Sequence, residues 1–304
     1  MLPLPSISPR PILARIFISS DEPRLRAGWR LLFQTIIMLF LLGCLGLPIG
    51  FLIYIPDSSI SDQQLMLFSE GISFFAILSS VFLSRRFLDK RSFSSLGLEN
   101  SSKMTRDLIA GFLIAFLSMS FLYIVEILLG WAKFKSFAWD TQSPVSVLSG
   151  SFLAIIIFIL VGWNEELLSR GYHLQTLAAG TNFPIGLILS SIIFGILHVT
   201  NPNASWISTL GIILAGLFLG FGYMRTRQLW LPIGLHIGWN FSEGVVFGFP
   251  VSGWNGFQIT NSNFAGPQLW TGGAFGPEAG LIVLPTLMIG TLLIHLYTLP
   301  KYRL

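Results

Sequence analysis

The sequence has few charged residues: of its 304 residues only 11% are charged, whereas 53% are hydrophobic. A soluble domain usually carries about 25% charged residues, so too few polar side chains are present to cover a water-exposed surface. The chain also has a single cysteine, Cys44, which excludes a disulfide within the chain and a zinc site built from several cysteines. The net charge of +4 by itself says little about nucleic acid and has to be read by position along the chain. We expect no nucleic-acid partner.

Several familiar patterns are absent as well. There is no His-Glu-x-x-His, the helix motif of many zinc proteases, and no Gly-x-Ser-x-Gly elbow of serine hydrolases. The two halves show no evident internal repeat, which argues against a transporter because repeats are common in transporters. Residues 1–28 hold five prolines and no long apolar core, so they predict a cytoplasmic N-terminal tail and not a cleavable signal peptide.

Long apolar stretches are what the sequence does have. A helix needs about 20 apolar residues to cross the hydrocarbon core of a bilayer. Eight segments approach or exceed that length, and no strand-like alternation recurs with the spacing of a membrane barrel. The sequence therefore predicts an all-α fold, a polytopic membrane bundle of about eight transmembrane helices near 29–55, 65–83, 107–130, 145–166, 183–200, 206–224, 229–248 and 279–299.

The basic residues predict the orientation of this bundle. Lysines and arginines gather in cytoplasmic loops, and a cytoplasmic N-terminus leaves only Lys133 and Lys135 outside, so that 16 of the 18 basic residues lie inside. An even number of helices then places both termini in the cytoplasm. We expect an integral protein of the plasma membrane or of another internal membrane, in contact with lipid.

The same segments predict how the chain is organised. After the tail at 1–28 come the first three transmembrane helices and then a core of four helices, numbered four to seven. An outer loop without basic residues and a last helix with a short tail complete the chain. The corresponding ranges are 29–130, 145–248, 249–278 and 279–304.

Ionisable residues inside apolar segments are the strongest indication of function. They are costly in a bilayer and usually face a partner or a water-filled cavity. The core contains three short patterns of this kind: Glu165-Glu166-Leu-Leu-Ser-Arg170, Phe194-Gly-Ile-Leu-His198 and His236-Ile-Gly-Trp-Asn240. Glu70 and Glu126 match no pattern, and we expect each to line a cavity or to bond a neighbouring helix. Further candidates are Glu243, as a partner of the site, and His173 and His295, as interfacial residues.

Helical spacing suggests which of these side chains work together. Residues four apart lie on one face of a helix, so Glu166 can pair with Arg170, while Glu165 points about 100° away and remains free. Each pattern also has a simpler explanation: an ion pair beside an interfacial glutamate, an interfacial histidine held near Phe194, and a hydrogen bond between helices.

Together, the three patterns supply the parts of a hydrolytic site. A carboxylate and an imidazole can take a proton from water, and an amide or imidazole can donate to a developing oxyanion. Equally, one carboxylate and two imidazoles could hold a zinc ion with an open position. The residues alone leave both alternatives open.

In these three patterns the sequence resembles the CAAX prenyl protease and bacteriocin-processing family, also called CPBP, Abi or type II CAAX endopeptidases. The family pattern is Glu-Glu-x-x-x-Arg, Phe-x-x-x-His and His-x-x-x-Asn on separate helices of an eight-helix intramembrane protease. The resemblance implies that Glu165 activates water with the help of His198, and that His236 and Asn240 bind the oxyanion. It also implies structural support from Glu166, Arg170 and Phe194.

The resemblance implies an intramembrane endopeptidase that hydrolyses a peptide bond of a membrane-associated or lipidated protein or peptide. The alternative is a non-catalytic membrane scaffold or immunity protein with the same fold, although the intact motif residues favour an enzyme. Family members have been described both as metalloproteases and as metal-independent glutamate proteases. We expect no obligatory metal, because the sequence near the histidines offers no carboxylate within reach of either ring. If zinc is present, its ligands would be Glu165, His198 and His236.

One spatial requirement follows from these assignments. Glu165 lies near the inner end of its predicted helix, whereas His198 lies near the outer end of the next one. For the two to meet, we expect the first helix to run past Arg170 and the second to begin well after Pro184.

Overall fold

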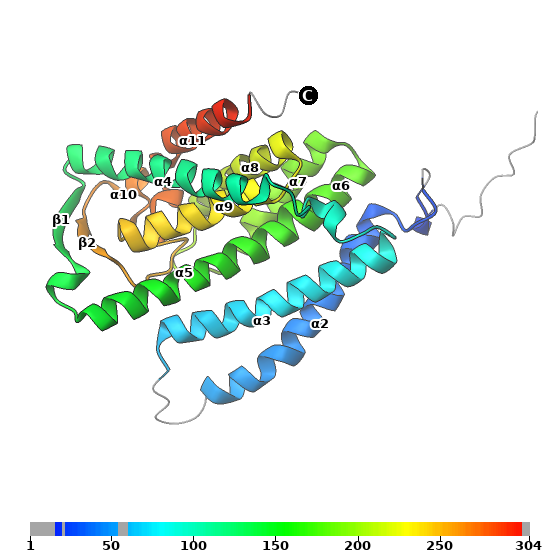
Figure 1. Ribbon diagram of the computed structural model, residues 1–304, viewed down its shortest axis with the longest axis horizontal. Coiled ribbons are helices and arrows are strands. Elements are labelled where there is room, and N and C mark those ends of the chain that lie inside the picture. Colours follow the sequence, from blue (N-terminus) through cyan, green and yellow to red (C-terminus); the bar gives the residue numbers. More distant parts are fainter. Residues whose placement is uncertain (1–15, 20–21, 54–59, 300–304) are drawn as a thin grey trace, which may run out of the picture.

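The computed structural model describes residues 16–19, 22–53 and 60–299. In this part of the chain each of the eight predicted segments contains a helix (Figure 1). Five spans are long and apolar enough to cross a membrane, and two further apolar helices, α7 and α11, are shorter. The predicted all-α membrane bundle is thereby confirmed. Its helices are α2 (Ala27–Ile53), α3 (Asp62–Leu83), α4 (Met104–Leu128), α5 (Pro144–Glu166), α7 (Phe183–Leu197), α8 (Trp206–Thr226), α9 (Trp230–Asn240) and α11 (Val283–Thr298).

Polar residues set the start of several helices. Ser61 caps α3 and forms a capping box with Gln64, Asn182 caps α7 by accepting from the backbone N–H of Ile185, and Ser205 caps α8. Such side chains satisfy backbone N–H groups that have no partner within the helix. In the nonpolar setting of a bilayer, an unsatisfied N–H group is especially costly.

Two of the helices that carry the motif residues continue into π-helical turns. Helix α5 passes through the π turn Leu167–His173 into α6 (Leu174–Gly180), and α9 passes into the π turn Phe241–Val246. Another π turn, Ser84–Leu88, follows α3. Turns of this kind often occur at functional sites, and here two of them directly follow predicted site residues.

Glycines allow α9 to pack very closely against its neighbours. Gly234 lies against the backbone of Leu108, and a Cβ atom on Gly238 would come within 2.6 Å of the Phe112 backbone on α4. On α8, Gly216 lies against Ser191 of α7. Small residues permit such close approach of helices in lipid. These close contacts place α8 and α9 in the interior of the bundle.

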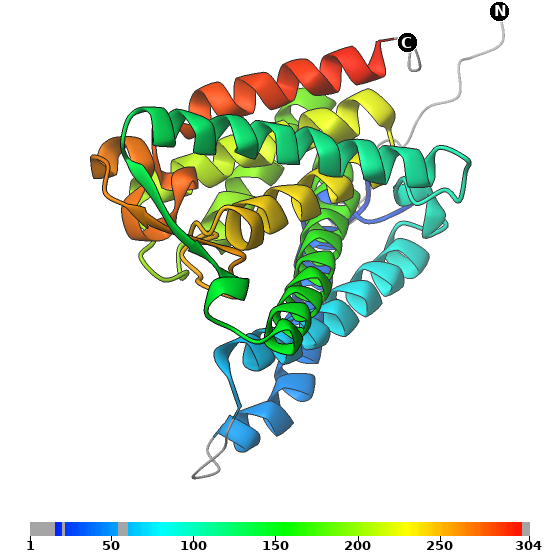
Figure 2. The same ribbon diagram turned by 60° about the vertical axis from the view of Figure 1, so that its left-hand side comes forward.

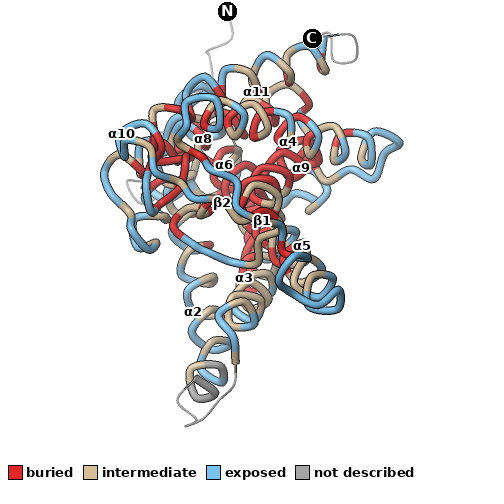
Figure 3. The backbone as a smooth tube through the Cα atoms, turned by 90° about the vertical axis from the view of Figure 1, so that its left-hand side faces the viewer, coloured by how far each residue is buried: buried red, intermediate tan, exposed pale blue. Residues whose placement is uncertain are grey.

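Burial differs strongly across the bundle. Figure 3 shows the buried backbone concentrated in α4, α8 and α9, whereas α2 is mainly intermediate or exposed. On α2, for example, Leu39 and Phe40 are 59% and 68% exposed. Large apolar side chains that are exposed along a helix in this way are typical of contact with lipid.

One end of the bundle carries two short strands. β1 (Ala132–Phe137) pairs antiparallel with β2 (Thr260–Phe264), as Figure 2 shows. β2 belongs to residues 247–282, which we call the outer segment and which also contains α10 (Gln268–Thr271). The sequence predicted an outer loop here and gave no indication of the strand pair.

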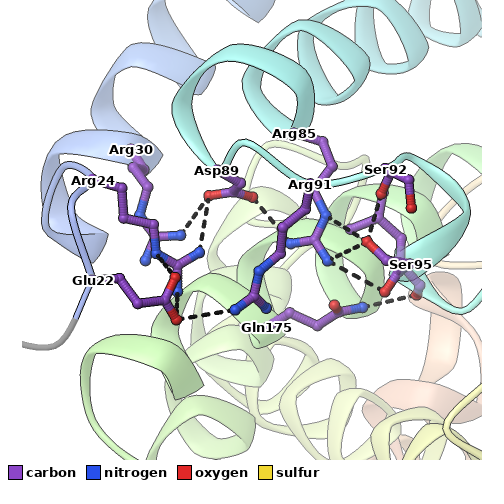
Figure 4. A network of polar contacts seen from close by, with 10 residues as sticks. Glu22, Arg24, Arg30, Arg85, Asp89, Arg91, Ser92, Ser95 and Gln175 are labelled. Atoms are coloured by element: carbon purple, nitrogen blue, oxygen red, sulfur yellow. Dashed lines mark hydrogen bonds and ion pairs between the residues drawn. The ribbon is translucent and has the colours of Figure 1, made fainter.

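The opposite end carries a network of basic side chains around Asp89 (Figure 4). The carboxylate of Asp89 is fully buried and contacts Arg30, Arg85 at 3.1 Å and Arg24 at 3.9 Å. Glu22 joins Arg24 to Arg91, which lies two residues after Asp89. These contacts tie the start of α2 to the end of α3. They also place several of the predicted cytoplasmic basic residues at the end of the bundle away from β1, which holds Lys133 and Lys135.

Candidate active site

Three helices bring a carboxylate and two histidines together. The carboxylate Oε2 atom of Glu165 on α5 lies 3.6 Å from Nε2 of His198 and 3.7 Å from Nε2 of His236. His198 caps the C-terminus of α7, and His236 lies on α9. These three residues and Asn240 line one cavity of about 320 Å³, so the structure brings together the four side chains that the sequence singled out.

The helix lengths explain how Glu165 and His198 meet. The apolar span that includes α5 runs from Pro144 to Gly180, past Arg170 as expected, so Glu165 lies near its middle. The expectation that the next helix begins well after Pro184 is wrong, because α7 starts at Phe183 with Pro184 in its first turn. Helix α7 has only 15 residues, about 22 Å. His198 at its end is therefore well short of a full bilayer crossing of about 30 Å.

Glu166 connects His236 to an arginine. Its Oε1 atom lies 2.7 Å from Arg170 and 2.8 Å from Nδ1 of His236, and the side chain of Glu166 is fully buried. Arg170 also donates to the carbonyl of Gly216 and lies over the ring of Phe194. An ionised carboxylate only accepts hydrogen bonds, so Nδ1 of His236 carries the proton that it donates to Glu166. Spacing predicted the pair with Arg170, but not the bond to His236.

His198 is held in a similar way. Its Nδ1 atom lies 2.8 Å from the carbonyl oxygen of Phe194, and its ring centroid is 4.8 Å from that of Phe194. Because a carbonyl only accepts, Nδ1 is the donor and Nε2 is left facing Glu165. Phe194 therefore fixes the imidazole with both its ring and its backbone, whereas the sequence suggested the ring alone.

Glu70 and Asn164 form a second polar pair in the cavity wall. The side-chain amide of Asn164 donates to the Oε2 atom of Glu70 at 3.0 Å and to its backbone carbonyl at 3.1 Å. Glu70 thus does both things expected of it, since it lines the cavity and bonds a neighbouring helix. Glu126 is fully buried in α4, is not among the residues lining the cavity, and its carboxylate oxygens have no hydrogen-bond partner among the described residues.

The outer segment contributes to the cavity through residues that sequence reasoning missed. Glu278 lines the cavity, is 4% exposed, and accepts a hydrogen bond from the hydroxyl of Ser252. The carbonyl of Ser252 accepts from Asn201, three residues after His198. Gly211 on α8 packs against the backbone carbonyl of Glu278. Nothing in the sequence near Glu278 indicated this position, because the contact joins segments far apart in the chain.

The remaining candidates lie outside this cavity lining. Glu243 is fully buried within the π turn after α9, and it does not line the cavity. His173 was expected at the membrane interface, but it is only 6% exposed and lies inside the π turn after α5. His295 lies in the last turn of α11.

Glu165, His198 and His236 have the side-chain chemistry of zinc ligands, but the distances between their donor atoms fit a zinc ion less well. Both histidines have their Nδ1 atoms engaged, by Glu166 and by the Phe194 carbonyl, as zinc-binding histidines usually do. The argument from sequence that such partners are lacking is therefore wrong. The 3.6 and 3.7 Å separations from Glu165 exceed the roughly 3.3–3.4 Å between donors around tetrahedral zinc. In the described ranges, no group of three histidine, cysteine, aspartate or glutamate side chains has the spacing to hold a metal ion.

Comparison with known proteins agrees with the motifs. The sequence profile of "Type II CAAX prenyl endopeptidase Rce1-like" proteins matches residues 147–242. A protein of Bacillus subtilis (strain 168) named "Putative membrane peptidase YdiL" is 30% identical over 219 residues, which cover 69% of this chain and 84% of that protein. The "Uncharacterized protein YyaK" of the same organism is 24% identical over 228 residues, covering 68% and 74% of the two chains. No solved structure matches the chain.

Proposed function

The chain belongs to the Rce1-like type II CAAX prenyl endopeptidase family of membrane peptidases, and we propose that it cleaves a membrane-associated or lipidated protein or peptide by means of a water molecule activated by Glu165. One observation carries this proposal. Among the described residues the Oε2 atom of Glu165 has no hydrogen-bond partner, and it faces the Nε2 atoms of two histidines in a cavity. Separations of 3.6–3.7 Å are too long for direct hydrogen bonds, and the Glu165 side chain is 30% exposed in the cavity, where a water can reach it.

The first chemical step is attack of this water on the peptide carbonyl. Glu165 takes one proton while the water oxygen bonds to the carbonyl carbon, and Nε2 of His198 accepts a hydrogen bond from the remaining O–H group and orients the molecule. A tetrahedral intermediate with a negatively charged oxygen results. Glu165 then gives its proton to the amide nitrogen, and the carbon–nitrogen bond breaks.

His236 and Asn240 are suited to stabilise the negative oxygen. The carboxylate of Glu166 at Nδ1 stabilises the imidazolium form of His236, in which Nε2 also carries a proton and can donate. Asn240 lies one helical turn further along α9 and adds the donors of its side-chain amide. Donors fixed before the reaction stabilise developing charge most effectively, and Glu166 and Arg170 supply that fixation.

We propose that no metal is required for this chemistry. If zinc is bound, Glu165, His198 and His236 would hold it, and it would polarise the water or the peptide carbonyl. The alternative function, a non-catalytic scaffold or immunity protein, receives no specific support from the arrangement. A scaffold has no need of a carboxylate and two oriented imidazoles that meet in one cavity.

The cavity reaches the surface at the end of the bundle away from the Asp89 network. Among its lining residues, Asp62 at the start of α3 and Trp254 to Gly256 of the outer segment are exposed. With both termini in the cytoplasm, as we propose from the basic residues, this opening lies on the non-cytoplasmic side. A peptide substrate would then enter from that side or from the lipid.

Cleavage of a peptide library by the purified full-length protein in detergent tests the proposed function. We expect discrete cleavage products with the wild-type protein and none with Glu165→Ala or Glu165→Gln. The matched control Glu126→Gln changes another glutamate at membrane depth but lies outside the cavity lining, and it should retain activity. Cleavage that survives Glu165→Gln, or no cleavage of any peptide by wild-type protein, would refute the proposal.

A further inference from the structure

The cavity is lined by several acidic residues and, among the residues that the structure describes, by no lysine or arginine. Besides Glu165, it is lined by Asp62 and Glu70 of α3 and by Glu278 of the outer segment, and no lysine or arginine is among its described lining residues. Other buried or partly buried carboxylates, those of Asp89 and Glu166 for example, contact arginines. Within the described residues, no ion pair with lysine or arginine is formed by the cavity acids.

Asn164 makes the pocket beside Glu70 still richer in acceptors. Its amide nitrogen is engaged by Glu70, whereas its Oδ1 atom has no partner among the described residues, although the side chain is only 1% exposed and lines the cavity. A buried acceptor left unpaired costs free energy. Glu70 and Asn164 thus place acceptor oxygen atoms in the cavity wall, and such a wall suits a ligand with several N–H donors.

The surroundings of this pair fit a long basic side chain. Apolar residues line the same cavity, among them Met66, Phe158 and Leu168, and such walls can hold the aliphatic stem of a lysine or arginine while its charged end meets oxygen atoms. The carboxylates of Glu70 and Glu165 also interact electrostatically. A cation beside Glu70 would reduce the repulsion between these two negative charges.

We infer that the preferred substrates carry a lysine or arginine close to the scissile bond, and that Glu70 and Asn164 bind this side chain. The inference rests on the proposed peptidase function and names the class of peptide that the site takes. Asn164 is adjacent to Glu165 in α5, so the basic side chain lies within a few residues of the bond that is cut.

The test uses pairs of peptides that differ only in charge, lysine against norleucine and arginine against citrulline, at each position around the cleavage site. At one position we expect the basic peptide to be cleaved with a kcat/KM roughly 10- to 100-fold higher, the range that a charge-assisted hydrogen bond provides. Glu70→Gln should reduce this ratio to about threefold or less. Glu70→Lys should favour glutamate at the same position, and the control Glu126→Gln should keep the wild-type ratio.

Two measurements separate this inference from the proposed function. Cleavage by wild-type protein without any preference for basic residues, or a preference that persists in Glu70→Gln, would refute the inference and leave the peptidase intact. Binding of the same peptides to Glu165→Gln, measured by fluorescence anisotropy with chelator present, gives an answer without catalysis. Tighter binding of the basic peptides supports the inference even if no cleavage occurs, and equal binding refutes it.

Discussion

Glu166→Gln should separate the structural glutamate from the proposed catalytic one. The Oε1 atom of Glu166 contacts both Arg170 and His236, and all three side chains are buried. Replacement by glutamine leaves Arg170 buried without a counter-charge, which typically costs about 3–5 kcal/mol. At about 2–4 °C per kcal/mol, the unfolding temperature should fall by roughly 6–20 °C. Activity should fall as well, because His236 loses the partner that orients it.

Glu165→Gln, in contrast, should abolish activity and leave stability nearly unchanged. Its Oε2 atom has no hydrogen-bond partner in the part of the chain that the structure describes, and its side chain is 30% exposed in the cavity. Loss of the charge removes no buried ion pair, so thermal stability should change by less than about 0.5 kcal/mol, as at sites without special contacts. Loss of a general base usually costs about 10²- to 10⁴-fold in rate, and cleavage should become undetectable in an endpoint assay.

Thermal unfolding in detergent and cleavage of one peptide, measured on the same samples, distinguish the two variants. The exposed Glu99 supplies a control, Glu99→Gln, that should alter neither property. The double variant Glu166→Gln/Arg170→Met should recover part of the lost stability, because it removes both charges of the pair. A stable, inactive Glu166→Gln together with an unstable Glu165→Gln would exchange the two assignments. A small loss of stability in Glu166→Gln would mean that the ion pair between Glu166 and Arg170 lies in water.

Three further predictions concern orientation, metal and the Asp89 network. In a variant without Cys44, cysteines placed at Lys90 and Asn263 should react with a membrane-impermeant thiol reagent from opposite sides; labelling from one side would refute the topology. Purified active protein should contain well under one equivalent of zinc and keep its activity after exhaustive chelation, whereas activity that is lost on chelation and restored by zinc alone would make the metal obligatory. Asp89→Asn should lower stability by about 3–5 kcal/mol in the same unfolding assay, since it leaves three arginines around a buried neutral side chain; an unchanged unfolding temperature would contradict this.

Sequence reasoning located the helices because each carries its own signal. An apolar run long enough to cross a bilayer is a local property of the chain, and all eight expected segments contain a helix. The strand pair β1–β2 was missed because its hydrogen bonds join residues more than 120 positions apart.

In the candidate site, too, local contacts could be predicted from the sequence and contacts between distant segments could not. Contacts within one helix, such as Glu166 with Arg170, follow from four-residue spacing. Contacts between helices do not, and they include the bond from His236 to Glu166, 70 residues away, and that from Asn164 to Glu70, 94 residues away. The argument about zinc partners failed partly for this reason, because the carboxylate that holds His236 comes from another helix. For His198 it overlooked a backbone carbonyl, that of Phe194 on the same helix. Glu278 escaped notice because its position depends on the fold of the whole outer segment.

The shortness of α7 has a consequence for the surrounding bilayer. A 15-residue helix falls about 8 Å short of a hydrocarbon layer about 30 Å thick. The polar turn that follows His198 would therefore lie below the headgroups, where free backbone groups are not tolerated. The outer segment covers this turn through the bonds from Asn201 to Ser252 and from Asn203 to Ala274. Lipids beside α7 must still thin or tilt to match it, at a cost that rises with each ångström of mismatch. The length of the lipid acyl chains should therefore affect access to the site, because a thinner membrane gives water and peptide a shorter path to His198.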